Sequence, residues 1–177
     1  MTATLLAPAH VPPGAHPSAP AYVHPSVGPF RAAFADRPEW GPADLAGLAR
    51  LIAAGSQDAL RFEAVHDPAE RWYLRLALTG QVEVWLLGWA PGQATRPHHH
   101  GGAAGAYTVL DGELTETWRD GPVRSRRAVR SAGGGSAFGR ERVHQVANDG
   151  LEDATSVHVY SPPLLPLGTD VVLEDPA

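Results

Sequence analysis

The chain has 177 residues, 44% of them hydrophobic, which is enough for one domain with a substantial core. A net charge of -5 and a pI near 5.9 provide no basic surface, so we expect neither nucleic acid nor a membrane as a partner. The absence of cysteine excludes disulfides, thiolate metal ligands and a cysteine nucleophile.

The first segment, residues 1–27, is rich in proline, alanine and histidine. Because this composition resists regular structure, we expect a flexible tail, followed by a single domain over residues 28–177. His10, His16 and His24 in the tail are expected to be solvent-exposed. The segment lacks the basic and apolar regions of a signal peptide, and no apolar run is long enough to span a membrane, which predicts a cytoplasmic protein.

One short helix is predicted before the strands begin, over residues 42–54. Pro42 suits a first helical turn, and Gly55 is expected to end the helix. The apolar stripe that would face the core consists of Leu45, Leu48, Leu51 and Ile52.

From Trp72 onward, short alternating segments separated by glycine turns predict strands. We expect them at residues 72–79, 82–89, 106–110, 113–118, 125–130, 136–138, 144–146 and 155–160. The first pair should form a hairpin across Gly80-Gln81, and the second pair another across Asp111-Gly112. This pattern indicates an all-β-dominated fold, an antiparallel β-barrel or jelly roll with a short N-terminal helical segment.

Histidines supply the strongest functional signal. Because residues i and i+2 of a strand face the same way, His98 and His100 can both point into the barrel, whereas His99 points away. His144, on a later strand, can approach this pair across the barrel. Imidazoles suit iron, zinc, copper or nickel, so the ligand set leaves the metal open. A histidine run is also typical of exposed loops, and His144 alone would more simply be a hydrogen-bonded core residue.

Glycines around these histidines complete a pattern that resembles the two-motif signature of the cupins. The first motif is matched at Gly92, His98, His100 and Gly112, with Gly105 where a glutamate ligand is usual. The second motif is matched loosely at Gly133, His144 and Asn148, while Gly139 and Glu141 depart from it. The resemblance implies a single cupin domain.

Further residues narrow this resemblance to the cysteine dioxygenase family of thiol dioxygenases. They are Trp89, Tyr73-Leu-Arg75 and Ser156-Val-His158-Val-Tyr160-Ser-Pro-Pro163, so the similarity runs from about Tyr73 to Pro163. It implies an iron-dependent enzyme that oxidises L-cysteine with O2 to cysteine sulfinate. As in the family, the bond between Ser161 and Pro162 is a candidate for the cis form.

The resemblance also assigns roles to residues. It implies that Fe(II) is bound by His98, His100 and His144, that Ser156, His158 and Tyr160 are catalytic, and that Arg75, with Tyr73 beside it, binds the substrate carboxylate. Alternation on strands would place each of the last two groups on one face, and the arginine fork can hold a carboxylate with two charge-assisted bonds. Animal members join a cysteine to the tyrosine; Gly105 excludes that crosslink here, which leaves Tyr160 a free phenol.

Alternative functions stay open at this point. Related enzymes that act on 3-mercaptopropionate carry glutamine at the arginine position, so Arg75 alone favours cysteine. A non-redox cupin would bind a metal without thiol-dependent O2 uptake. An oxygen-sensing dioxygenase acting on the N-terminal cysteine of a protein fits less well with a carboxylate-binding arginine. We expect a monomer whose partners are a small thiol and O2.

Overall fold

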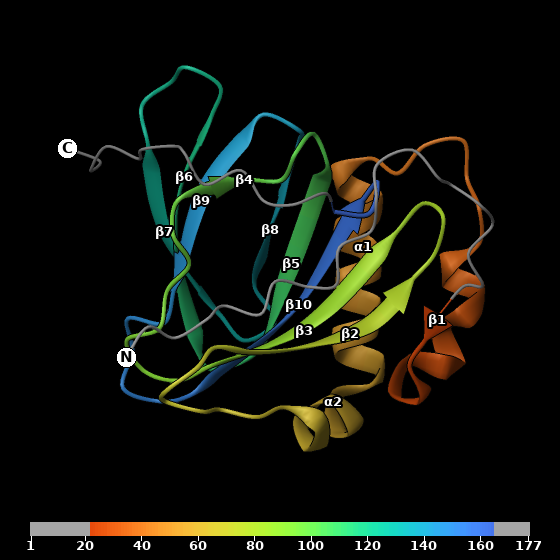
Figure 1. Ribbon diagram of the computed structural model, residues 1–177, viewed down its shortest axis with the longest axis horizontal. Coiled ribbons are helices and arrows are strands. Elements are labelled where there is room, and N and C mark those ends of the chain that lie inside the picture. The colour runs from red at the N-terminus through yellow and green to blue at the C-terminus, as the bar shows by residue number, and fades with distance from the viewer. Residues whose placement is uncertain (1–21, 165–177) are drawn as a thin grey trace, which may run out of the picture.

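The computed structural model describes residues 22–164 and confirms the predicted antiparallel, jelly-roll type of fold (Figure 1). A six-stranded sheet has the order β1-β2-β3-β10-β5-β8 and a four-stranded sheet the order β4-β9-β6-β7. Within the described part of the chain the two sheets stay separate and do not join into one closed barrel. The strands are β1 (Tyr22–Val23), β2 (Trp72–Leu78), β3 (Glu83–Trp89), β4 (His98–His99), β5 (Ala104–Asp111), β6 (Glu113–Asp120), β7 (Arg126–Ser131), β8 (Gly135–Phe138), β9 (Arg142–Ala147) and β10 (Ala154–Ser161).

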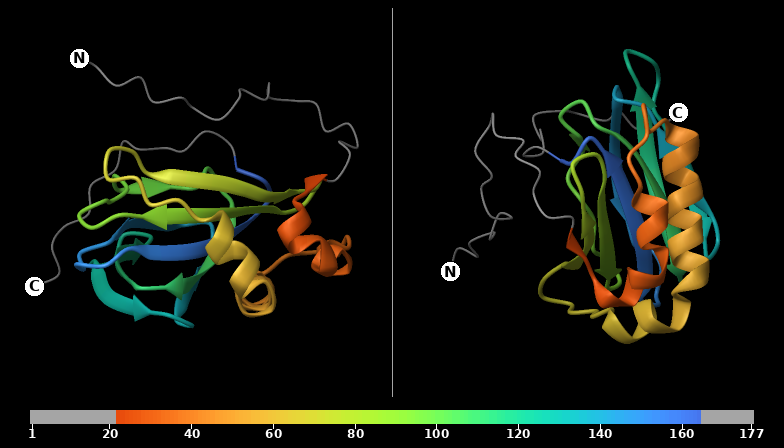
Figure 2. Two further views of the ribbon diagram at one scale, coloured as in Figure 1. Left: turned by 90° about the horizontal axis from the view of Figure 1, so that it is seen from below. Right: turned by 90° about the vertical axis from the view of Figure 1, so that its right-hand side faces the viewer.

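Helices cover one face of the six-stranded sheet (Figure 2). The predicted helix is confirmed as α1 (Pro42–Gly55), which packs on β5 and β10. Leu45, Leu48 and Ile52 are buried as expected, but Leu51 is 45% exposed and does not belong to the apolar stripe. Two further elements were not predicted, the 3-10 helix η1 (Pro25–Phe34) and α2 (Gln57–Glu63). No helix among residues 22–164 is long and apolar enough to cross a bilayer.

The fold begins earlier than the predicted end of the N-terminal tail at residue 27. Tyr22 and Val23 form β1, which pairs with β2, and Val27 is fully buried in the core. His24 is half-buried, and its Nδ1 accepts a hydrogen bond from the Ser26 N–H at the start of η1. His10 and His16 lie outside the described residues, as do residues 165–177.

Only the first of the two predicted hairpins forms. β2 and β3 pair as expected, but β5 and β6 belong to different sheets. The edges of β5 are occupied by β10 and β8, and those of β6 by β7 and β9, so neither strand has an edge left for the other. Gly112, at φ +72°, takes the chain from one sheet to the other, where a side chain would collide with the backbone of Asp153 and Ala154.

β10 separates two different interiors. Val157 and Val159 face the helices and are fully buried in the apolar cluster that includes α1. Ser156, His158 and Tyr160 alternate with them and face the four-stranded sheet, where they are equally buried. This second interior contains most of the residues to which the sequence assigned a function.

Candidate metal centre

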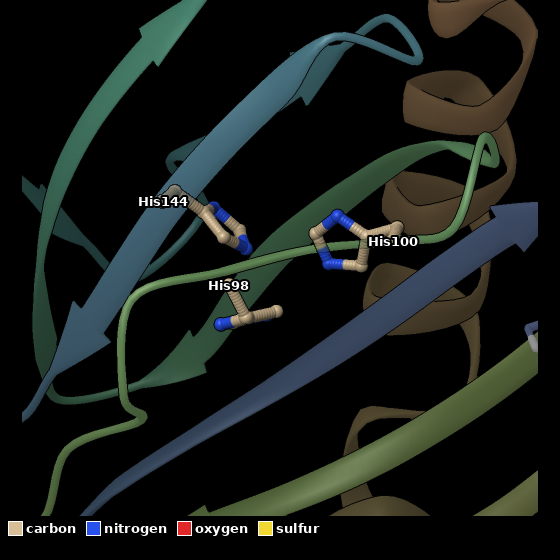
Figure 3. Close-up of side chains that lie close together, drawn as sticks. All are labelled: His98, His100 and His144. Carbon is tan, nitrogen blue, oxygen red and sulfur yellow. The ribbon is translucent and has the colours of Figure 1, made fainter. Parts of the chain in front are cut away.

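Three imidazoles converge between the sheets (Figure 3). His98 on β4 lies directly opposite His144 on β9, and His100 follows β4. One ligand nitrogen from each lies within 4.8 Å of the others, and the ring centroids are 4.8–4.9 Å apart. The expected convergence of the three therefore holds, but the expected approach of His144 across the barrel is wrong. His144 lies on β9, which is the neighbour of β4 in the same sheet.

His99 stays out of this cluster, as the alternation predicts. Its side chain is half-buried, and its Nδ1 accepts a hydrogen bond of 3.1 Å from the Gly101 N–H. The Ser161-Pro162 peptide bond is cis, in agreement with the resemblance.

All three clustered imidazoles are held in the uncharged form that binds metals. Burial is the main cause that lowers the pKa of His98, His100 and His144 below the usual value. Neither ring nitrogen of His100 has a hydrogen-bond partner among the described residues, although both are buried. A buried unpaired imidazole is costly, and a metal ion would satisfy one of these nitrogens. The donor set thus fits a metal ion that prefers nitrogen ligands.

Aromatic rings fix His100 in place of hydrogen bonds. Its ring stacks on Phe138 at 5.0 Å and lies 5.0 Å from the Tyr160 ring. Gly105 lies between these two aromatics on β5, opposite both of them in the sheet. A Cβ there would come within 2.6 Å of Phe138 and 2.9 Å of Tyr160. The glycine that replaces the usual glutamate ligand therefore also makes room for the rings beside His100.

Ser156, His158 and Tyr160 form one continuous hydrogen-bonded row beside the cluster. Ser156 Oγ lies 2.9 Å from His158 Nε2, and His158 Nδ1 lies 3.2 Å from the Tyr160 hydroxyl. Trp89 extends the row, because its indole N–H donates to Ser156 Oγ at 2.9 Å. Burial, with the nearby His144, lowers the pKa of His158 to about 3, and burial raises the pKa of the Tyr160 phenol. The row is neutral and protonated at the phenol.

Arg75 and Tyr73 lie on the same face of the sheet as this row, but Arg75 has a partner of its own. Its Nε is 3.0 Å from Glu83 Oε1, and its guanidinium lies 4.6 Å from the centre of the Trp85 ring. The Glu83 side chain is 5% exposed, and burial raises the pKa of its carboxyl. Arg75 can therefore bind the carboxylate of another molecule only in competition with the internal carboxylate of Glu83.

Arg71 is a second cation on this face, which the sequence analysis missed. Its Nε is buried without a hydrogen-bond partner among the described residues, and its guanidinium lies 5.3 Å from the Trp89 ring centre. Its positive charge lowers the pKa of His158 further and partly opposes the rise in the pKa of Tyr160 that burial causes. Its position, two residues before Tyr73 and four before Arg75 on alternating backbone, was the available signal.

Glu116 is the other functional candidate that the sequence analysis missed. It is fully buried on β6, and its Oε1 lies 2.9 Å from His144 Nδ1. Leu114, Glu116 and Trp118 alternate along β6, so an acid stands in the row of apolar residues that faces inward. An acidic residue at an inward-facing position of a strand could have indicated from the sequence that Glu116 makes a buried polar contact.

Solved structures with the same fold are numerous. TT1209 from Thermus thermophilus is 24% identical over 58% of this chain and 93% of its own, with a TM-score of 0.51. A conserved protein with a double-stranded β-helix domain from Klebsiella pneumoniae subsp. pneumoniae MGH 78578 is 21% identical over 62% and 91%, with the same score of 0.51. An oxalate oxidase in complex with the substrate analogue glycolate is 20% identical over 59% and 57%, also at 0.51.

These similarities establish the fold, which is the double-stranded β-helix of the Klebsiella pneumoniae protein. Among proteins with this fold, residues 43–167 match the model of the cysteine dioxygenase type I family. The match covers more than half of the chain, so the chain belongs to that family. Family membership and the three-histidine cluster together support an oxidoreductase of the thiol dioxygenase type.

Proposed function

We propose that the protein is an iron-dependent dioxygenase that converts L-cysteine and O2 to cysteine sulfinate. The thiol sulfur takes up both oxygen atoms of O2 and a proton is released, so the reaction needs no outside reductant. One observation carries the proposal: in a member of this family, three buried neutral imidazoles lie beside the hydrogen-bonded row of Ser156, His158 and Tyr160.

His98, His100 and His144 are the proposed ligands of Fe(II). Three neutral ligands would leave bound iron with its full positive charge, and such an ion would lower the pKa of an incoming thiol and hold the thiolate close to O2. The protein contributes rigidity, because two of the proposed ligands are paired across β4 and β9 and the third packs against the rings of Phe138 and Tyr160.

The hydrogen-bonded row on β10 is proposed to orient the phenol of Tyr160 as a proton donor. The Trp89 N–H occupies one lone pair of Ser156 Oγ, which favours donation of the serine hydroxyl to His158 Nε2. His158 Nδ1–H then donates to the Tyr160 oxygen, and the phenol proton is free to be donated into the pocket. Since the phenol stays protonated, Tyr160 acts as a hydrogen-bond donor to the reacting oxygen atoms rather than as a base.

The substrate carboxylate has two candidate partners, Arg75 and Arg71. The resemblance favours Arg75, but Glu83 already neutralises its charge. The buried Nε atoms of both arginines lack a hydrogen bond that meets the usual geometry, but Arg71, unlike Arg75, forms no ion pair among the described residues. We propose that both guanidiniums face the bound thiol substrate, with Arg71 carrying the larger share of carboxylate binding. A charge-assisted hydrogen bond contributes about 1.5–3 kcal/mol, or about 10- to 150-fold in KM.

Paired substitutions separate the two arginines. We expect Arg71→Gln to raise KM for cysteine about tenfold or more and Arg75→Gln to raise it less, with metal content unchanged in both. Arg61→Gln, on the exposed helix α2, is the matched control and should leave KM unchanged. A larger rise in KM for Arg75→Gln than for Arg71→Gln would show that Arg75 is the main partner of the substrate carboxylate.

A second substrate, 3-mercaptopropionate, has specific support. It lacks the amine of cysteine, and its recognition by relatives does not require an arginine at the position of Arg75. Because Glu83 engages Arg75 here, this arginine favours cysteine less strongly than the sequence alone indicated.

O2 uptake by the Fe(II)-loaded protein tests the proposal directly. We expect a higher kcat/KM with L-cysteine than with 3-mercaptopropionate. Equal or greater turnover of 3-mercaptopropionate would assign that thiol as the substrate. Stable metal binding with no O2 uptake on either thiol would instead favour a non-redox metal-binding cupin.

A further inference from the structure

A buried carboxylate lies directly behind one of the three clustered imidazoles. Glu116 is 0% exposed, and its Oε1 lies 2.9 Å from His144 Nδ1. Neither the fold nor the proposed reaction requires an acid at this position. An uncompensated buried carboxylate is costly, so its partners define its role.

Within the described part of the chain, two further groups donate hydrogen bonds to Glu116. Arg142 Nη1 donates to Oε1 at 3.0 Å, and the Tyr107 hydroxyl donates to Oε2 at 3.3 Å. Arg142 is itself held by Asp120, through contacts of 2.6 Å and 3.2 Å. A carboxylate beside a guanidinium accepts hydrogen bonds, so His144 Nδ1 must carry the proton that lies between the two groups. Nε2 of His144 is then the nitrogen left with a free lone pair.

The three imidazoles differ sharply in what lies behind them. His98 Nδ1 lies 2.8 Å from the backbone oxygen of Arg96, a neutral acceptor. His100 has aromatic neighbours and no hydrogen-bond partner among the described residues. Among the contacts of residues 22–164, only that of His144 joins one of the three imidazoles to a carboxylate. The three proposed ligands are uncharged, but the carboxylate of Glu116 lies in contact with one of them.

We propose that Glu116 is a positioning residue of the metal centre, which fixes the tautomer of His144 and strengthens the donation of its Nε2 to the metal. The inference rests on the metal site of the proposed function but not on the thiol chemistry. A metal-binding histidine commonly donates its second N–H to such an outer partner, and loss of that partner typically costs about 10- to 100-fold in metal affinity or activity. Arg142, which is itself held by Asp120, donates to the same carboxylate oxygen that contacts His144.

Glu116→Gln tests the charge with little change in shape. The amide can keep an oxygen toward His144 and Arg142, and Arg142 keeps Asp120 as a counter-ion. We expect Zn(II) affinity, measured by competition with a chromogenic chelator, to fall about 10- to 100-fold. Glu113→Gln, the same change on the exposed face of β6, should leave the affinity unchanged. Thermal unfolding of the metal-free variants shows that both are folded. A folded Glu116→Gln variant with affinity within twofold of the parent would overturn the proposal.

A second measurement needs no variant. In the Zn(II)-loaded parent protein, 15N–1H correlation spectra of the imidazoles should show His144 protonated at Nδ1 and metal-bound at Nε2. Metal bound through Nδ1 would contradict the role of Glu116, whatever the stability of the variants. Both tests use zinc and no thiol, so the inference can fail while the dioxygenase activity stands. Conversely, absence of cysteine oxidation leaves these zinc results meaningful.

Discussion

The two faces of β10 serve different purposes although their residues alternate along a single strand. Toward the helices, Val157 and Val159 pack in an apolar cluster whose stabilisation depends on buried area and volume. Toward the four-stranded sheet, Ser156, His158 and Tyr160 depend on individual hydrogen bonds and ring contacts. The difference teaches that stability and chemistry can be perturbed separately here, because neighbouring residues report on opposite interiors.

The largest effect is expected from the metal cluster. His144→Ala removes one of the three proposed ligands, so metal affinity should fall by at least about 100-fold, more than after the loss of an outer partner. Metal content after dialysis and Zn(II) affinity measure this. His99→Ala is the matched control, since it removes an imidazole next to the cluster without removing a member. A His144→Ala protein that retains a full equivalent of metal would remove His144 from the ligand set.

An effect on the rate alone, with the metal retained, is expected at Tyr160. Tyr160→Phe removes the hydroxyl at the end of the row but keeps the ring that lies against His100. Proton donation by a positioned group typically contributes about 10²- to 10⁴-fold, so kcat should fall within that range while metal affinity stays within about twofold. Single-turnover kinetics and metal titration together measure both quantities. A parallel loss of metal would mean that the hydroxyl supports the cluster instead.

Gly105→Ala should lower both the stability of the fold and the affinity for the metal. The added methyl group collides with the rings of Phe138 and Tyr160, which flank His100. Overpacking of this kind costs about 1–3 kcal/mol of unfolding free energy, and we expect metal affinity to fall with it. Urea denaturation and Zn(II) titration test the two effects. Gly139→Ala, where the methyl would meet open space, should change neither.

The smallest effect on the site is expected from the opposite face of β10. Val157→Ala removes two buried methyl groups and should lower the unfolding free energy by about 2 kcal/mol. Metal affinity and kcat/KM should stay within about twofold of the parent values. Denaturant unfolding and steady-state kinetics of the same preparation decide this. A large change in metal affinity would show that the two interiors are coupled through the strand.

The sequence predicts much of this arrangement because period-two alternation and glycine turns are local signals. They identify α1, eight strands and the shared face of His98 and His100. Pairing is different, because it depends on which edges are free. The Asp111-Gly112 turn has the local chemistry of a hairpin, yet β10 and β8 already occupy both edges of β5. No local pattern contains that information.

Contacts between distant residues were also beyond reach. Glu116 and His144 are 28 positions apart, and only the pairing of β6 with β9 brings them together. Arg75 matches the resemblance, but the carboxylate of Glu83 that engages it depends on the register of β2 and β3. Residues that ligate or react carry recognisable motifs, whereas the partners that orient them depend on the three-dimensional fold.

The central claim is most directly tested by the oxygen content of the product. The Fe(II)-loaded protein is incubated with L-cysteine under ¹⁸O2, and the product is analysed by mass spectrometry. The account predicts cysteine sulfinate that contains two ¹⁸O atoms. Cystine as the only product, or a sulfinate without both labelled atoms, would contradict it.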